Sequence, residues 1–533
     1  MNLRRIMSRS ALGVITAMLF ACGGGREGSS VDVGLSAPAR PSCTIESLRE
    51  VPDVRITSVT KESSPAPHCK VLGVIGTETN FELLLPDDWN GKFVMGGGGG
   101  FVGSVVNTAL AYGPLQKGFA TVGTDTGHRG SAIDASWALN NLERVVSFGH
   151  QAVHRTAVTA KALIAEYYGR DSSRNLFFGC SRGGGQALME AQRYPEDFDG
   201  IVAGAPAHNW TEELGGRNTL INQAMFPDPN DLSVATITPE ARKLIGNAVM
   251  QQCDSLDGLQ DGILNNPLDC DFEVTRLACK AGKSDGCLTP KQLEAAKRVY
   301  EGLILDGEQV VPGFVPGAEL DLSGWERWVA GGLDVIELSE FQRGIEPDPD
   351  YPDPDTPNAI FAFGNGIMKY LVFHDPDWDY STYDFSTFRS DVAAVSSTLD
   401  ATDSNLDAFR ARGGKLLLFN GWGDMALTPL GTIAYYEDVI KRDASAADNV
   451  RLIMLPGMSH CFGGPGPSLV NWVDEIDRWV DTGQAPDQLA AYWVNKQMQP
   501  DGSRPACAYP KYLKYNGSGD PRAASSFSCV NLD

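Results

Sequence analysis

Basic residues are outnumbered in this chain. Its 533 residues include 44 lysines and arginines against 67 aspartates and glutamates, which gives a net charge of −23 at pH 7. A surface of this sign repels the phosphates of nucleic acids, so we expect no nucleic-acid partner. Acidic surfaces are common among exported proteins, and the charge points to no particular activity.

Several sequence patterns are absent as well. No two cysteines have the Cys-x-x-Cys spacing of common zinc sites, no Gly-Lys-Ser/Thr follows the glycine run of residues 96–100, and no internal repeat is detectable. These absences argue against a structural zinc, a Walker-type phosphate loop and a repeat architecture.

The N-terminus has the pattern of an export signal. Three arginines precede a short apolar run, residues 11–21, that is too short to span a bilayer comfortably. The run ends directly before Cys22, as in bacterial lipoprotein signals, in which that cysteine is lipidated; an ordinary signal peptide cut nearby is the alternative. We therefore expect a signal peptide at 1–21 and a Gly/Ser-rich tether at 22–42. The protein would be an outer-membrane lipoprotein with a lipid anchor, or periplasmic or secreted.

Ten cysteines remain when Cys22 is set aside. In an exported protein an even number of cysteines predicts disulfides. Proximity along the chain favours three pairs, 253–270, 279–287 and 507–529.

Strand-like and helical segments alternate on both sides of a long interruption. Short apolar runs such as "NLFFGC" (175–180) and "KLLLFN" (415–420) are followed by segments of helical periodicity. This alternation predicts an α/β fold with a mostly parallel sheet and helices on both faces. Residues 208–400 interrupt this alternation of strand-like and helical segments. We therefore expect a core of 43–207 and 401–533 with the intervening segment inserted as a lid.

The sequence Gly-Cys-Ser-Arg-Gly, residues 179–183, fits the G-x-S-x-G motif in the context where that motif carries a nucleophile. It follows a buried strand and begins a helix, so its glycines allow a sharp turn that exposes the serine oxygen at the carboxyl end of the sheet. The helix N-terminus favours developing negative charge. Ser181 is therefore the candidate nucleophile, and a merely structural strand–helix turn is the alternative.

A nucleophilic serine needs a histidine base and an acid that orients the histidine, and in this fold the acid precedes the histidine. Of the three histidines after Ser181, His208 lies at the junction with the insertion, His374 lies inside it, and His460 follows a strand late in the core. Asp424 follows a strand and precedes a helix, where the acid is expected. A helix-capping aspartate and a surface histidine are the alternatives for Asp424 and His460.

Two backbone amides are expected to stabilise the oxyanion of such a reaction. One belongs to Arg182, directly after the serine. The other is expected from the glycine run 96–100, where no side chain obstructs the amides. A flexible loop and a phosphate-binding loop are the alternatives for that run.

Three motifs together, "GCSRGG", "GWGD" followed by a proline, and "MSHCFGGPG", resemble the tannase and feruloyl esterase family, which includes bacterial hydrolases of aromatic monoesters. The resemblance implies an α/β-hydrolase fold with a large lid domain, a triad of Ser181, His460 and Asp424, and oxyanion donors at Gly100 and Arg182. It also implies five disulfides, one of which ties the serine to the histidine loop. These are Cys43–Cys69, Cys180–Cys461, Cys253–Cys270, Cys279–Cys287 and Cys507–Cys529.

The segment "CDSLDGLQDGIL" places three aspartates among glycines. Carboxylates at such spacing suit Ca²⁺ in a loop, although the pattern is not that of an EF-hand and a solvated acidic turn is the alternative. The family resembled here has a structural calcium in its lid at this motif, and no organic cofactor is expected. By resemblance the ligands are the side chains of Asp254, Asp257 and Asp261 and the carbonyls of Leu259 and Ile263.

The sequence thus predicts an exported, monomeric serine carboxylesterase that hydrolyses esters of aromatic acids, feruloyl, other hydroxycinnamoyl, galloyl or related, through an acyl-enzyme. A hydrolase of mono(2-hydroxyethyl) terephthalate-type monoesters is one alternative, but such relatives carry a lid arginine where this chain has Ile367, with Lys369 nearby. A non-catalytic surface binding protein and an exported peptidase are the others. Six lid aromatics are candidates for stacking on the substrate ring, although most such residues prove to be core: Trp325, Trp328, Phe361, Phe363, Tyr370 and Phe373.

Overall fold

The computed structural model describes residues 42–48, 51–283, 285–331 and 356–531. The expected signal peptide, Cys22 and nearly all of the tether lie outside these ranges, so their assignment stays a prediction. None of the helices in the described ranges combines the length and the apolar character that a membrane span requires.

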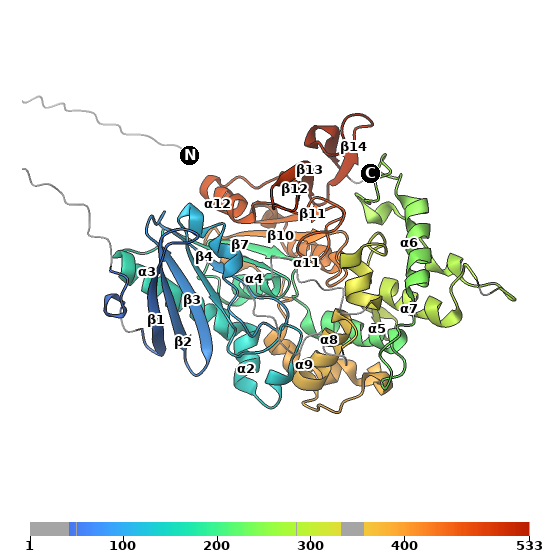
Figure 1. Ribbon diagram of the computed structural model, residues 1–533, viewed down its shortest axis with the longest axis horizontal. Helices are drawn as coiled ribbons and strands as arrows, with labels where there is room; N and C mark the ends of the chain where they lie inside the picture. Colours follow the sequence, from blue (N-terminus) through green and yellow to red (C-terminus); the bar gives the residue numbers. More distant parts are fainter. Residues whose placement is uncertain (1–41, 49–50, 284, 332–355, 532–533) are drawn as a thin grey trace, which may run out of the picture. The chain divides into compact units, whose positions relative to one another are not determined.

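Eleven strands form one large sheet, in the order β1-β2-β3-β5-β4-β6-β7-β10-β11-β13-β12 (Figure 1). The strands are β1 Val54–Glu62, β2 His68–Ile75, β3 Thr79–Pro86, β4 Lys92–Gly96, β5 Ala120–Thr124, β6 Arg174–Cys180, β7 Gly200–Gly204, β10 Lys415–Gly421, β11 Val450–Leu455, β12 Gln488–Val494 and β13 Pro500–Ala508. The six strands from β5 to β11 in this order run parallel to one another, while both edges of the sheet are antiparallel.

The expectation of a mostly parallel sheet was wrong at the edges. Five pairs of neighbouring strands are parallel and five are antiparallel. Short connections account for three of the antiparallel pairs, because only residues 63–67, 76–78 and 495–499 join β1 to β2, β2 to β3 and β12 to β13. Parallel neighbours need a crossover of a dozen or more residues. Alternating hydrophobicity tells which face a side chain takes, but not which way a strand runs.

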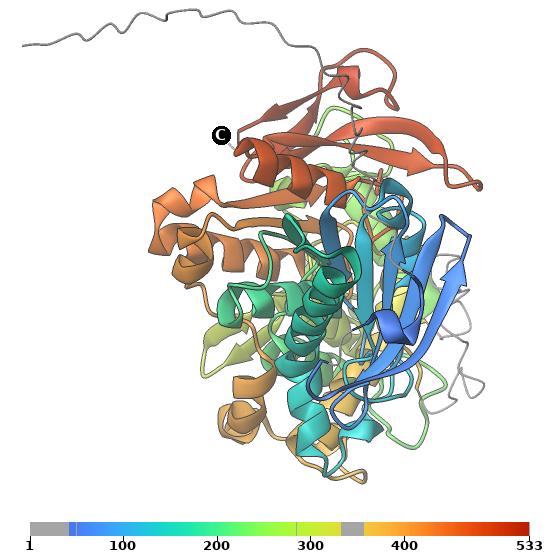
Figure 2. The same cartoon turned by 90° about the vertical axis from the view of Figure 1, so that its left-hand side faces the viewer.

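Side chains of the central strands alternate between two apolar layers. On β4, Phe93 and Met95 belong to one layer and Val94 to the other. The first layer is covered by α3, α4 and α11, and the second by α12. Figure 2 looks onto α3, in teal, beside the blue strands β1 to β3. These helices span Ala152–Tyr168, Arg182–Arg193, Pro429–Arg442 and Trp472–Thr482.

The described residues between 208 and 400 add no strand to the large sheet. They form a separate helical layer whose apolar side chains make their own cluster, shared with Phe101 and Phe148 of the core. The labelled helices of this layer lie together to the right of and below the sheet in Figure 1. Their place fits the expected lid, whose boundaries stay a prediction. The elements are η5 Trp210–Arg217, α5 Asn218–Met225, α6 Pro239–Cys253, α7 Pro290–Glu301, β8 Leu303–Leu305, β9 Glu308–Val311, η8 Leu322–Ala330, α8 Ala359–Gly366, η11 Ile367–Val372 and α9 Phe388–Leu399.

Candidate active site

Ser181 is the single residue between β6 and α4. Its backbone has φ 62° and ψ −123°, a strained conformation for a residue that carries a side chain. Three backbone hydrogen bonds hold it: the Ser181 amide donates to the Gly204 carbonyl at 3.0 Å, and the Ser181 carbonyl accepts from the amides of Ala207 and Gly185 at 2.9 and 3.1 Å. Gly179 permits the tight turn, because a Cβ there would clash with the backbone of Gly183. This is the strand–turn–helix geometry that the motif predicts.

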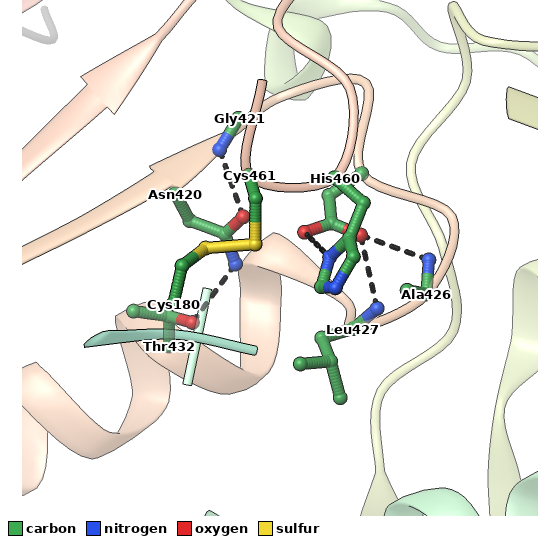
Figure 3. Close-up of a disulfide and its surroundings, with 9 residues drawn as sticks. Cys180, Asn420, Gly421, Ala426, Leu427, Thr432, His460 and Cys461 are labelled. Carbon is green, nitrogen blue, oxygen red and sulfur yellow. Dashed lines mark hydrogen bonds and ion pairs between the residues drawn. A yellow bond between two sulfur atoms is a disulfide. The ribbon is translucent and has the colours of Figure 1, made fainter. Parts of the chain in front are cut away.

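Asp424 and His460 form a buried hydrogen-bonded pair. One carboxylate oxygen of Asp424 accepts from the amides of Ala426 and Leu427 at 2.8 and 3.0 Å, and the other lies 2.8 Å from Nδ1 of His460 (Figure 3). The Asp424 side chain is fully buried, and the His460 side chain is 12% exposed. Because a carboxylate only accepts, Nδ1 carries the proton, and Nε2 is the ring nitrogen left to accept one.

A disulfide joins Cys180 and Cys461 across 281 positions of the chain. These cysteines are the direct neighbours of Ser181 and His460, and their Cα atoms are 5.9 Å apart, so the serine turn and the histidine loop belong to one site (Figure 3). The described residues contain five disulfides, and they are the pairs that the resemblance implies. The other four are Cys43–Cys69, Cys253–Cys270, Cys279–Cys287 and Cys507–Cys529.

A pocket with mostly apolar walls lies at Ser181. The ring of Trp328 in its wall stands edge-on to the imidazole of His460, with 5.0 Å between the ring centroids. The chemistry of these walls suits an aromatic ring, because stacked and edge-on contacts add to the burial of its surface. The lining residues are Gly100, Ser181, Arg182, Ala207, Trp210, Leu214, Trp328, Phe363, Ala426 and Leu427.

Sequence reasoning found only part of this wall. Trp328 and Phe363 were among the six lid aromatics considered, and the other four are not among the lining residues. Trp325 and Phe361, for example, are buried against other aromatic rings inside the lid. Trp210 was missed, because a tryptophan at the start of a helical segment reads as core. Ile367 is buried beside Gly215 and does not line the pocket.

Two backbone amides next to Ser181 have no acceptor within the described protein. They belong to Gly100 and Arg182, both of which line the pocket. Gly100 has φ 52°, and a Cβ there would clash with the carbonyl of Ala132, so this position requires glycine. Free amides placed beside a serine are suited to bind an oxyanion.

The side chain of Arg182 has a structural role that the motif did not suggest. It is buried, and its guanidinium donates to the carbonyls of Phe148 and Gly149 and lies over the rings of Phe148 and Trp210. Burial lowers the pKa of Arg182 to about 9, so the group stays protonated at neutral pH. It fixes the start of α4 to the wall of the pocket.

The acidic loop, residues 253–264, is closed on itself by its three aspartates. Each accepts a hydrogen bond from a backbone amide of the loop, which joins Asp254 to Gly262, Asp257 to Leu259 and Asp261 to Ile263 at 2.8, 3.0 and 3.2 Å. Burial raises the pKa of Asp257 to about 6, against two backbone hydrogen bonds that lower it.

Arg504 is a partner of this loop that the sequence did not reveal. Its guanidinium forms an ion pair with Asp261 and lies over the rings of Trp493 and Phe527. Phe527 begins β15 (Phe527–Val530), which pairs with β14 (Tyr512–Tyr515). The cation neutralises one of the three carboxylates and ties the loop to the C-terminal strands.

The donor set of the loop fits a hard cation such as Ca²⁺. It offers three carboxylates, and the carbonyls of Leu259 and Ile263 accept no hydrogen bond from the described residues. The aspartates are not drawn tightly together, however. In the described part of the chain, the candidate metal-ligating side chains whose ligand atoms all lie within 4.8 Å of one another are His154, Glu190 and Asp197.

Comparison with known proteins places the chain among esterases. A model of the tannase and feruloyl esterase family matches residues 65–530. The chain is 32% identical to an uncharacterized esterase of Xanthomonas campestris pv. campestris, over 94% of this chain and 92% of that protein. It is 31% identical to the mono(2-hydroxyethyl) terephthalate hydrolase of Piscinibacter sakaiensis, over 87% and 85%. The crystal structure of feruloyl esterase B from Aspergillus oryzae superposes with a TM-score of 0.78 at 27% identity, covering 90% of this chain and 98% of that one.

Proposed function

Because the chain belongs to the tannase and feruloyl esterase family, whose members named above are carboxylic ester hydrolases, we propose that it hydrolyses esters of aromatic acids through a triad of Ser181, His460 and Asp424. One observation carries this proposal. The strained serine turn and the His460–Asp424 pair are tied together by the Cys180–Cys461 disulfide beside a pocket with aromatic walls.

In the proposed reaction, Nε2 of His460 takes the proton of the Ser181 hydroxyl as Oγ attacks the ester carbonyl. The amides of Gly100 and Arg182 bind the oxyanion. His460 then passes the proton to the leaving alcohol, and water attacks the acyl-enzyme by the same route. Asp424 holds the histidine tautomer and stabilises the imidazolium.

The acyl group is proposed to be feruloyl, another hydroxycinnamoyl, galloyl or a related aromatic group. The pocket supports this choice, because Trp210, Trp328 and Phe363 offer flat apolar contacts. A terephthalate monoester would bring a free carboxylate into mostly apolar surroundings, which is unfavourable unless the charge is paired. No arginine stands at position 367 to pair it.

The test is a comparison of kcat/KM for methyl ferulate, methyl gallate and mono(2-hydroxyethyl) terephthalate, with Ser181→Ala as the blank. We expect kcat/KM for the better of the ferulate and gallate esters to exceed kcat/KM for the terephthalate monoester by roughly tenfold. The reason is the free-energy cost of placing an unpaired, partly solvated carboxylate in the pocket. A preference for the terephthalate monoester would favour the alternative activity, to which the relative of Piscinibacter sakaiensis lends support. Turnover of none of the three would refute the proposal.

We propose further that the acidic lid loop holds a structural Ca²⁺ through Asp254, Asp257, Asp261 and the carbonyls of Leu259 and Ile263. The cation would neutralise the carboxylates and stiffen the loop. The loop reaches the histidine side of the site, since a Cβ at Gly457 would come within 3.0 Å of the Ile263 side chain.

Export and lipidation at Cys22 are proposed from the N-terminal sequence, and action as a monomer from the presence of all three triad residues in one chain. The five disulfides support export, because such bonds persist in oxidising compartments. Cys22→Ala should release the protein from the membrane fraction of the native host, with the mass of the mature N-terminus as the direct readout. An unchanged membrane fraction would contradict lipidation.

A further inference from the structure

A buried ion pair in the lid lies against the loop that carries Asp424. Glu213 and Arg217 are one turn apart on η5, and their side chains are 3% and 0% exposed. Nη1 of Arg217 lies 3.0 Å from Oε1 of Glu213. On an exposed helix such an i, i+4 pair contributes little, but here both charges are removed from water, so each depends on its remaining partners.

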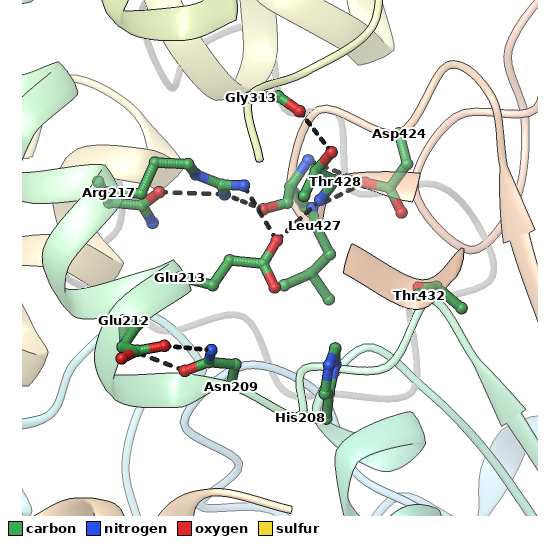
Figure 4. A network of polar contacts seen from close by, with 12 residues as sticks. His208, Asn209, Glu212, Glu213, Arg217, Gly313, Asp424, Leu427, Thr428 and Thr432 are labelled. Atoms are coloured by element: carbon green, nitrogen blue, oxygen red, sulfur yellow. Dashed lines mark hydrogen bonds and ion pairs between the residues drawn. The ribbon is translucent and has the colours of Figure 1, made fainter. Parts of the chain in front are cut away.

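The acid loop, residues 424–428, supplies one further partner to each charge, while Arg217 also donates to Oδ1 of Asn218 at 3.3 Å. The amide of Thr428 donates to Oε1 of Glu213 at 2.8 Å, and Nη2 of Arg217 donates to the carbonyl of Ala426 at 3.1 Å (Figure 4). The amides of Ala426 and Leu427 are the groups that hold Asp424. The same short loop is therefore bonded to the triad acid on one side and to the lid ion pair on the other.

The lid holds this loop at a second place. Oγ1 of Thr428 donates to the carbonyl of Gly313 at 2.6 Å (Figure 4). The guanidinium of Arg217 lies 4.1 Å from the ring centroid of Phe314. Burial lowers the pKa of Arg217, whereas the negative charges of Glu213 and Asp424 favour its charged form. The acid loop is thus fixed by lid residues from two separate segments.

We propose that Glu213 and Arg217 are positioning residues for Asp424. Through this pair the lid fixes where the Asp424 carboxylate lies relative to Nδ1 of His460. The inference rests on the proposed triad. Neither side chain touches the reacting atoms. Each fixes one backbone group of the acid loop, and a misplacement of about 1 Å in a catalytic group costs on the order of a hundredfold in rate.

The competing explanation is that the pair only fastens the lid to the core. The chain offers a matched control, since Arg242 is a buried lid arginine that likewise bonds one glutamate, Glu326 at 2.6 Å, and one backbone carbonyl, that of Glu319 at 2.9 Å. Neither of these two bonds involves the acid loop. Loss of Arg242 should therefore lower the melting temperature without a comparable loss of kcat.

The experiment compares Glu213→Gln, Arg217→Met and Arg242→Met in two backgrounds, the native chain and Asp424→Asn. Circular dichroism and the melting temperature establish that each variant is folded at the assay temperature. In the native chain we expect Glu213→Gln and Arg217→Met to lower kcat by roughly ten- to a hundredfold with KM changed less than about threefold. Arg242→Met should change kcat less than about threefold.

The Asp424→Asn background separates positioning from fastening. If the pair acts through Asp424, its removal should lower kcat by less than about threefold once the carboxylate is gone, because contacting residues couple and independent ones add. An equal fold-loss in both backgrounds, or native kcat in Glu213→Gln, would overturn the inference.

Two further variants keep the test decisive if a single charge left buried prevents folding. The pair Glu213→Gln with Arg217→Met removes both charges together, and Arg217→Lys keeps the charge while losing the forked geometry. Both should fold and show the same kcat loss, and native kcat in both would overturn the inference. The proposed triad is tested separately, because full activity of the Asp424→Asn variant would refute the triad itself. If Asp424→Asn lowers kcat while Glu213→Gln leaves kcat at the native value, only the positioning role is refuted.

Discussion

Cys180 and Cys461 connect the serine turn to the histidine loop by a covalent bond, although 281 positions separate them in the chain. Each is the direct neighbour of a proposed triad member, so the disulfide limits how far His460 can drift from Ser181. Asp424 is held differently, by the backbone amides of Ala426 and Leu427 in its own loop, and the same loop is bonded to Glu213 through the amide of Thr428. The three residues of the proposed triad are thus positioned by different means.

Replacing Cys180 and Cys461 together with alanine should lower kcat far more than it raises KM. The chain-entropy model assigns the closure of so long a loop about 6 kcal/mol of stability, so the assay should be run well below the melting temperature of the variant. The matched control is Cys279→Ala with Cys287→Ala, which removes a lid disulfide closing a span of 8 positions. A normal kcat in the Cys180/Cys461 variant would show that the bond only stabilises the fold.

Asp424→Asn should lower kcat/KM by on the order of 10³- to 10⁴-fold. The amide can donate to Nδ1, which favours the wrong histidine tautomer while the fold is retained. Steady-state kinetics on methyl ferulate or p-nitrophenyl acetate measures the loss. Native activity would mean that another acid serves His460.

Much of this site can be predicted from the sequence, for identifiable reasons. The serine turn is a local feature, since a buried strand, glycines and a helix follow one another within a few residues around Ser181. Asp424 and His460 follow from chain order and from their places after strands. The five disulfide pairs followed from the resemblance.

What the sequence could not supply depends on contacts between distant segments. Glu213 and Thr428 are 215 positions apart. In the sequence, an i, i+4 Glu–Arg pair is typical of a solvated helix face, and only the structure shows that this pair is buried. Arg504 likewise reaches Asp261 across 243 positions. The antiparallel edge strand β1 was not predicted from the sequence, because its polar and apolar residues alternate only weakly.

Removal of calcium should lower the melting temperature by several degrees and leave initial activity largely intact at low temperature. Once the ion leaves, the carboxylates of Asp254, Asp257 and Asp261 repel one another, with Arg504 as a single compensating cation. Elemental analysis should find about one calcium per chain in the native protein and much less in Asp257→Ala. Asp271→Ala, at an exposed position, is the control. No bound calcium, together with a melting curve unaffected by chelator, would contradict the site.

Glu190→Gln should make stability less sensitive to pH. Burial, and then the charge of Asp197, hold the pKa of Glu190 well above its ordinary value of 4.5. Between that value and the raised one, the unfolded chain has lost a proton that the folded chain keeps, so native stability falls as pH rises. The neutral amide removes this linkage. The difference in melting temperature, Glu190→Gln minus native, should therefore increase from pH 5 to pH 8.

The exposed Glu166→Gln is the control for this comparison and should show no such trend. A difference between Glu190→Gln and the native protein that stays constant with pH would contradict the buried neutral carboxyl.

The most direct test of the account is to identify the residue that becomes covalently modified. The protein is incubated with diisopropyl fluorophosphate, and intact-mass and peptide mass spectrometry locate the label. We expect one phosphoryl group per chain, on Ser181, with loss of ester hydrolysis in step with labelling and no label on Ser181→Ala. A label on another residue, or a Ser181→Ala variant that keeps more than about a tenth of the native rate, would contradict it.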